Sequence, residues 1–217
     1  MKIEIFSDFV CPFCYIAKRE LELAIEQAGY AGQVTIEMKA YELSPNSSLQ
    51  SVNYIDSLIE HGMSREKVEQ LTANITDRAK EVGLTYNFEE MTVTNTYSVH
   101  RLAKWMKQFS KEAEFTEAVM RGYFTQGLDL SRDDGLLAIV RALGLDEVDA
   151  ANVLATDRFE EEVKRDQYDV QQIGVTRVPF FVFENRYGII GAEPNEVFVR
   201  TLHQAAEIAG IQAREQQ

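Results

Sequence analysis

The stretch from Ile5 to Lys18, IFSDFVCPFCYIAK, contains both cysteines of this 217-residue chain, Cys11 and Cys14. It follows the run Lys2 to Phe6, whose apolar residues predict a buried strand. Pro12 is typical of the first position of a helix, since a proline there removes no helical hydrogen bond. The stretch therefore predicts a strand, a short loop and a helix that begins at the two cysteines.

The composition is that of a globular protein, with 45% hydrophobic and 26% charged residues. No apolar run approaches the roughly 18 residues that a membrane span needs, so we expect no membrane association. The 22 basic and 35 acidic residues give a net charge of -13, which disfavours nucleic acid as a partner. The opening residues, MKIEIFSD, lack the features of a signal peptide, and we expect the protein to be cytoplasmic.

The rest of the chain changes its periodicity twice. The first helix is expected to end at Gly29 and Gly32, and apolar and polar residues then alternate from Val34 to Ala40, which predicts a second strand with one buried face. Leu43 to Gln50 has the composition of a linker, and Ser51 to Ile173 has helical periodicity throughout. We place helix N-caps at Ser64, Ser131 and Asp146, and helix ends at Gly62, Gly83 and Gly144.

Strands return after Gly174. Pro179 to Phe183 is short and apolar, Glu184 to Arg186 can turn, and Tyr187 to Ile190 can pair back as a hairpin. A final amphipathic helix is expected to start at Pro194. The predicted order is strand, helix, strand, helical block, strand, strand and helix, which indicates one domain carrying a large insertion.

The spacing of the cysteines permits a reversible disulfide. If Pro12 opens the helix, Cys11 is its cap and Cys14 lies one turn along, within the roughly 4.4 to 6.8 Å between alpha carbons that a disulfide requires. The helix start favours a thiolate at Cys11, which should therefore be the attacking sulfur. A zinc site would need further ligands, and the three histidines lack a suitable spacing. We expect no metal, and histidines that are solvated or hydrogen-bonded locally: His61, His100 and His203.

Four stretches together resemble the DsbA family of the thioredoxin superfamily, and in particular its FrnE-like cytosolic branch: DFVCPFCYIAK, YFTQGLDLS, ALGLD and GVTRVPFFVFENRYGIIGAEP. The resemblance covers nearly the whole chain. It implies an α/β, thioredoxin-like fold with a large all-helical insertion domain. Residues 1–45 and 174–217 would form the thioredoxin-like domain, and residues 46–173 the helical insertion domain.

The resemblance also implies a dithiol-disulfide exchange enzyme. Cys11 would be the nucleophile and Cys14 the resolving thiol, with Val178 preceding a cis Pro179 that lies against the pair. Family members often carry tryptophan at the position of Phe13 and glycine at that of Arg177, so these residues would alter the substrate contacts. The implied partners are proteins or small thiols that carry a thiol or a disulfide, with glutathione as a redox partner and no other cofactor.

Several apolar residues have two interpretations. They can form a collar around the sulfurs that docks unfolded segments, or they can be ordinary core residues; they are Phe9, Val10, Phe13, Val178 and Phe180.

Two other functions compete with disulfide exchange. One is the group of kappa glutathione transferases and 2-hydroxychromene-2-carboxylate isomerases, which shares the implied architecture and uses glutathione but typically has serine at the position of Cys11. The other is a chaperone-like binding module in which the cysteines are incidental. Both cysteines together favour dithiol chemistry over either alternative.

Overall fold

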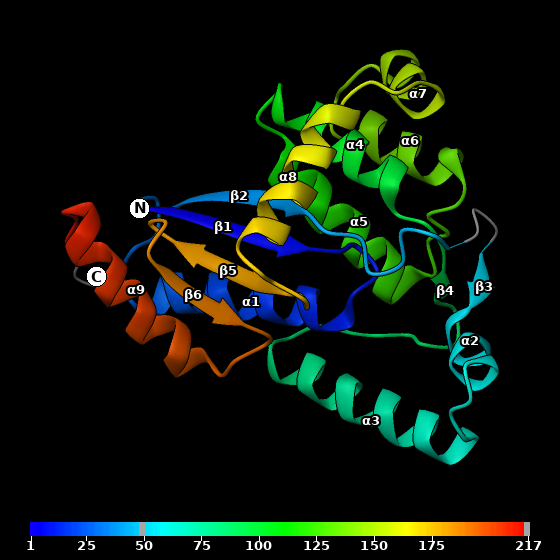
Figure 1. Cartoon of the computed structure of the whole chain (residues 1–217), viewed down its shortest axis with the longest axis horizontal. Coiled ribbons are helices and arrows are strands. Elements are labelled where there is room, and N and C mark those ends of the chain that lie inside the picture. Colours follow the sequence, from blue (N-terminus) through cyan, green and yellow to red (C-terminus); the bar gives the residue numbers. More distant parts are fainter. Residues whose placement is uncertain (48–50, 215–217) are drawn as a thin grey trace.

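The computed structural model describes residues 1–47 and 51–214, and in this part of the chain a mixed sheet has the strand order β2-β1-β5-β6. Strand β1 pairs parallel with β2 and antiparallel with β5, and β5 pairs antiparallel with β6. The predicted hairpin near the carboxyl end therefore lies beside the first strand, as Figure 1 shows. The strands are β1 (Lys2–Ser7), β2 (Thr35–Ala40), β5 (Phe180–Phe183) and β6 (Tyr187–Ile190).

Two helices cover one face of this sheet, α1 (Pro12–Gln27) and α9 (Asn195–Ala209). Their apolar residues recur every three or four positions and pack with side chains of β1 and β5 in one hydrophobic cluster. Gly29 follows α1 with a φ of +75°, and a Cβ there would lie 2.6 Å from the backbone oxygen of Arg214. Only glycine fits this position, which joins the end of α1 to the carboxyl-terminal segment.

The segment between β2 and β5 forms the other cluster of helices (Figure 1). We expected this segment to be helical throughout. It is not, because Val52–Asn53 (β3) and Thr92–Val93 (β4) pair as a small antiparallel sheet. Two-residue strands leave no detectable period in a sequence. The helices are α2 (Tyr54–Glu60), α3 (Arg65–Glu81), α4 (Tyr97–Lys107), α5 (Glu112–Gln126), α6 (Asp133–Ala142), α7 (Glu147–Ala155) and α8 (Glu160–Gln172).

Strand β2 differs from its prediction, because its polar face is covered as well as its apolar one. Lys39 forms an ion pair with Asp166 of α8 at 3.1 Å, and Lys104 of α4 pairs with the same carboxylate at 2.6 Å. Asp166 is only 3% exposed and also accepts a hydrogen bond from the backbone N–H of Ala40 at 2.8 Å. The charged residues that alternate along β2 thus attach the helical region to the sheet rather than face solvent.

Most predicted helix boundaries are confirmed. Ser64 and Asp146 cap α3 and α7 by accepting hydrogen bonds from the backbone N–H groups of Lys67 and Val148. The cap at Ser131 is wrong, since α6 begins two residues later and the Ser131 hydroxyl bonds Asp129 instead. The glycines predicted to end helices all have positive φ, at +91° for Gly62, +78° for Gly83 and +79° for Gly144. Pro194 was expected to be the first residue of the last helix and is instead the cap of α9.

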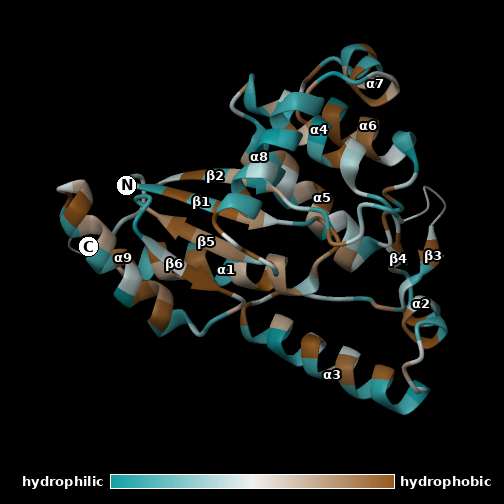
Figure 2. Ribbon diagram, in the orientation of Figure 1, coloured by the Kyte–Doolittle hydropathy of each residue, from teal (hydrophilic) through white to brown (hydrophobic). Residues whose placement is uncertain are grey.

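Hydrophobic packing joins two groups of elements: the sheet with α1 and α9, and the helices between β2 and β5. One cluster contains Cys11, Cys14 and Ile16 at the start of α1 together with buried residues of α3 to α7. Figure 2 shows that β5 is largely apolar, that α3 alternates polar and apolar residues, and that α8 is mostly polar. The division of the chain at residues 45 and 173 stays a prediction, and residues 48–50 of the predicted linker lie outside the described residues. No helix in the described ranges combines the length and apolar character needed to traverse a bilayer.

Candidate active site

Both cysteines lie at the start of α1, as the spacing predicted. Pro12 is the first helical residue, Cys11 is the cap with an extended backbone, and the Cys14 N–H donates to the Cys11 carbonyl at 3.0 Å. The turn that precedes them is closed by the Cys11 N–H, which donates to the Asp8 carbonyl at 3.2 Å. Both are free thiols, and their residues are 4% and 1% exposed. A helix start places unpaired N–H groups beside the sulfur of the cap residue.

The two thiols differ in their surroundings. Burial raises the pKa of the Cys14 thiol well above its ordinary value, and a hydrogen bond with Cys11 raises it further. Cys14 therefore keeps its proton at neutral pH and donates it toward the Cys11 sulfur. Cys14 is thus the buried, protonated partner of the pair.

Three side chains from the helical region reach this turn, and the sequence interpretation missed all of them. The Tyr86 hydroxyl donates to the Pro12 carbonyl at 2.7 Å, and burial, followed by the neighbouring Cys11, raises the pKa of Tyr86. The same two causes raise the pKa of Tyr54 to about 12. The Arg78 guanidinium lies 5.6 Å from the Phe13 ring centroid and donates to the Ala192 carbonyl. Their separation from the cysteines along the chain left no local signal that could have identified them.

The contact between Tyr86 and Pro12 leads to a first prediction. Tyr86→Phe removes one buried hydrogen bond while keeping the ring stacked on Phe124, whose centroid is 4.6 Å away. We expect the free energy of unfolding to fall by about 1 kcal/mol, the net value of one hydrogen bond. Urea unfolding of the reduced protein measures this loss. Thr125→Val, which removes a partly exposed hydroxyl that bonds Thr85, is the matched control and should cost less. Equal losses in both variants would contradict the assigned role of Tyr86.

The segment before β5 contains the remaining predicted site residues. The Val178–Pro179 peptide bond is cis, and Val178 packs against the hydrophobic cluster that contains both cysteines. Pro179 is buried, and its carbonyl accepts a hydrogen bond from the Gly191 N–H at 2.7 Å. Arg177 is exposed. Substrate contacts by Phe13, Arg177, Val178 and Pro179 stay predictions.

The proposed apolar collar is divided between surface and core. Val10, Phe13 and Val178 are partly exposed and pack on the cluster around the cysteines. Phe9 belongs to the core, since it is 4% exposed and its ring lies 6.3 Å from that of Phe115. Phe180 is half-buried, and its ring packs 6.2 Å from that of Phe6 across the paired strands.

The histidines are separated in the fold. His61 and His203 are exposed as expected. His61 bonds locally, to the Ser57 carbonyl at 2.7 Å, whereas His203 bonds the distant Tyr30 hydroxyl at 3.0 Å. Our expectation was wrong for His100, which is 4% exposed and whose Nε2 lies 3.5 Å from Oδ1 of the buried Asp8. Within the described residues, no three carboxylate, histidine or cysteine side chains are grouped so that they could bind a metal.

The sequence model of the DSBA-like thioredoxin domain matches residues 2–203. The chain belongs to this family. A crystal structure of a probable DsbA oxidoreductase from Streptomyces coelicolor is similar to this DsbA-like protein, with 30% identity and a TM-score of 0.90. The similarity covers 100% of this chain and 93% of the other. The family assignment agrees with the thioredoxin-like fold expected from the resemblance.

Two further proteins are similar over most of this DsbA-like chain. The uncharacterized protein YwbO of Bacillus subtilis is 26% identical over 203 residues, which cover 92% of this chain and 94% of YwbO. A 2-hydroxychromene-2-carboxylate isomerase structure has 16% identity and a TM-score of 0.69, with 96% of each chain covered. At that identity the isomerase shows a shared fold only.

Proposed function

We propose that this protein is a thiol-disulfide oxidoreductase that exchanges disulfides through Cys11 and Cys14. The observation that carries the proposal is the placement of both thiols at the start of α1, with the buried Cys14 directed toward Cys11. Family membership supports the same reaction class, since DsbA-like oxidoreductases act on thiols and disulfides.

In the proposed reaction, the Cys11 thiolate attacks one sulfur of a substrate disulfide and forms a mixed disulfide. The first substrate thiolate leaves. Cys14 then loses its proton and attacks the Cys11 sulfur, which releases the second substrate thiolate and leaves Cys11 and Cys14 bonded. Two electrons pass from the cysteine pair to the substrate, and the reverse sequence oxidises a substrate dithiol.

The proposed substrates are proteins or small molecules that present an exposed thiol or disulfide, because Cys11 and Cys14 are only 4% and 1% exposed and could not reach a sulfur buried in a folded partner. Glutathione is the small thiol we propose as redox partner. The exchange reaction requires no bound cofactor, since the cysteine pair itself carries the two electrons. We also propose that the reaction takes place in the cytoplasm.

The decisive experiment uses the Cys14→Ser variant with glutathione disulfide as the probe. Without its resolving thiol the protein should retain one glutathione on Cys11, whereas the unchanged chain should release it and form an internal disulfide. Mass spectrometry under non-reducing conditions measures the adduct, which dithiothreitol should remove. Cys11→Ser is the matched control and should acquire little adduct. An adduct on Cys14 rather than Cys11 would contradict the assigned roles.

The same variants distinguish the isomerase alternative. An isomerase or glutathione transferase would need one polar side chain at the position of Cys11 and would not need Cys14. Turnover of 2-hydroxychromene-2-carboxylate that persists in Cys14→Ser would therefore favour that alternative over disulfide exchange.

A further inference from the structure

The rim of the cysteine site carries a cation that has no part in the reaction described so far. Arg78 of α3 is exposed, and its guanidinium carbon lies 5.6 Å from the ring centroid of Phe13, the residue between Pro12 and Cys14. This separation is within the roughly 6 Å of a cation–π contact. Arg78 Nη2 also donates to the Ala192 carbonyl at 2.5 Å. Figure 1 shows that the end of α3 lies beside the end of β6 at this point.

These two contacts place the Arg78 guanidinium between the two halves of the site. Phe13 belongs to the cysteine turn. Ala192 follows Gly191, whose N–H donates to the Pro179 carbonyl at 2.7 Å, and Pro179 is the cis proline. The guanidinium therefore connects the residue between the cysteines to the segment that is bonded to the cis proline.

The charge of Arg78 is not neutralised by an ion pair. Within residues 1–47 and 51–214, no acidic side chain pairs with it, and the bond to Ala192 is the one hydrogen bond that its guanidinium makes. Its charge nevertheless acts on a nearby anion. Burial raises the pKa of the Glu20 carboxyl of α1, and the charge of Arg78 opposes that rise. Arg78 thus keeps an available positive charge and unused N–H donors, in a chain whose net charge is -13.

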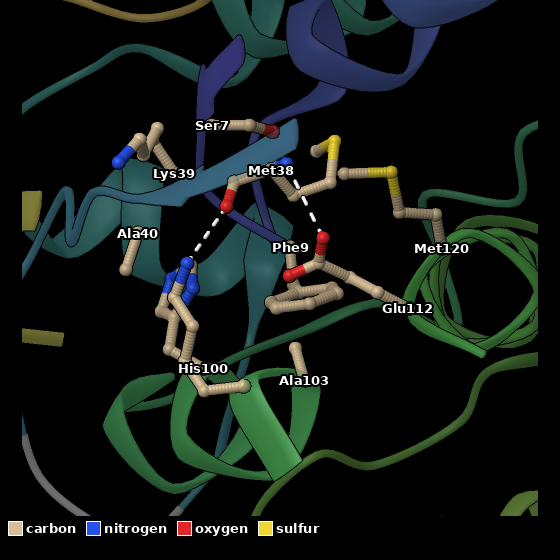
Figure 3. A pocket seen from close by; sticks show the side chains of 10 residues that line it. Ser7, Phe9, Met38, Lys39, Ala40, His100, Ala103, Glu112 and Met120 are labelled. Atoms are coloured by element: carbon tan, nitrogen blue, oxygen red, sulfur yellow. Dashed lines mark hydrogen bonds between the residues drawn. The ribbon is translucent and has the colours of Figure 1, made fainter. Parts of the chain in front are cut away.

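A charged group beside a substrate disulfide would lie on this rim. Cys11 is only 4% exposed, and the partly exposed Phe13 and Val178 pack on the cluster that contains it, so a substrate sulfur must approach across them. The interior offers no room for such a group. The small cavity lined by His100 and Glu112 (Figure 3) has a volume of about 10 Å³, which accommodates about one water molecule. The charged group would therefore remain outside, next to Phe13 and its guanidinium.

We propose that Arg78 selects disulfides that carry a carboxylate close to the reacting sulfur, by pairing its guanidinium with that carboxylate. The inference rests on the proposed function and specifies its substrate class. A guanidinium presents N–H donors that match the two oxygens of a carboxylate. The contacts with Phe13 and Ala192 hold it in place before a substrate arrives, which reduces the entropy lost on binding. Glutathione disulfide belongs to this class, because each half carries two carboxylates.

A second exposed arginine is the alternative cation. Arg177 precedes Val178 and so lies close to the cis proline along the chain. In the part of the chain that the structure describes, its guanidinium makes no hydrogen bond and no ion pair. Its side chain is therefore not fixed in one position, and binding a carboxylate would cost more rotamer entropy than at Arg78. We expect Arg78 to make the larger contribution to selection.

The test compares three disulfides of different charge in the full chain with Cys14→Ser, where attack by Cys11 is the only step. They are glutathione disulfide, which is anionic, hydroxyethyl disulfide, which is neutral, and cystamine, which is cationic. Mass spectrometry of acid-quenched samples gives the rate constant of adduct formation. In Arg78→Gln we expect the rate with glutathione disulfide to fall about fivefold, the upper range for an exposed ion pair. The rate with cystamine should rise about threefold, because a like charge is removed.

The neutral disulfide and the salt dependence provide readouts that a structural role would not change. A displaced cysteine turn, or an altered ionisation of Cys11, would change all three rates by the same factor. The rate with hydroxyethyl disulfide corrects for both effects, and we expect it to change by less than about twofold. In about 1 M salt the Debye length is about 3 Å, so the fivefold difference between Arg78 and Arg78→Gln should shrink to less than about twofold.

Arg65→Gln is the matched control, since Arg65 begins the same helix and is also exposed. It lies about 20 Å from Arg78 along the helix axis, and its loss should change each rate by less than about twofold. Equal losses with the anionic and the neutral disulfide in Arg78→Gln would overturn the inference. A larger loss in Arg177→Gln than in Arg78→Gln would do the same. If Cys11 forms an adduct with none of the three disulfides while Arg78 is present, the proposed function fails instead.

Discussion

Replacing Cys11 by serine is expected to abolish disulfide exchange, with a loss on the order of 1,000-fold or more, as for removal of other catalytic nucleophiles. A serine hydroxyl at the same cap position remains protonated near neutral pH and cannot form a disulfide. The backbone of the turn should persist, because the Cys11 N–H and carbonyl make its contacts and the side chain makes no capping hydrogen bond.

The loss is measured as the rate of glutathione disulfide reduction, which is monitored by the free thiol released. The midpoint of thermal unfolding of Cys11→Ser should stay close to that of the unchanged chain in its reduced form, which excludes misfolding as the cause. Exchange that persists without Cys11 would place the nucleophile elsewhere. Suppression of protein aggregation that persists while exchange is lost would support the chaperone-like alternative for that activity.

Phe124→Ala is expected to cost about 3 to 5 kcal/mol of the free energy of unfolding, as for other fully buried aromatic residues. Phe124 of α5 is 0% exposed, and its ring stacks on Tyr15 of α1 at 5.7 Å and on Tyr86 at 4.6 Å. It thus joins the start of the cysteine-bearing helix to the helical region. The cavity left by the truncation would also remove support from Tyr86, which bonds the Pro12 carbonyl.

Urea unfolding of the reduced protein tests this prediction. Phe109→Ala is the matched control, since Phe109 is also a phenylalanine near a helix end but is 44% exposed, and we expect a loss of about 1 kcal/mol or less. Similar losses for the two variants would show that the aromatic stack does not carry the attachment. A separate unfolding step for the sheet, seen only in Phe124→Ala, would support the role of this stack in joining the two groups of elements.

Local sequence signals predicted the part of the site that local structure builds. Pro12 and the cysteine spacing identify the first turn of α1, because the fixed backbone angle of proline and the helical rise depend only on neighbouring residues. The two strands of the carboxyl-terminal hairpin were predicted for the same reason, since their period and turn are short-range. The strands β3 and β4 were missed because two residues are too few to show a period, and the cap at Ser131 failed because its hydroxyl bonds Asp129 while α6 begins at Asp133.

The sequence by itself determined the position of the cysteine pair at a helix start, together with the order of the main strands and helices. Only the tertiary structure decided what surrounds that pair. Tyr86, Arg78 and His100 are brought to the cysteine turn from helices and loops more than sixty residues away, and the buried Asp8 acquires its imidazole partner in the same way. The physical reason is that burial and charge pairing are set by packing between distant segments, whereas helix starts and strand periods are set by the residues within them.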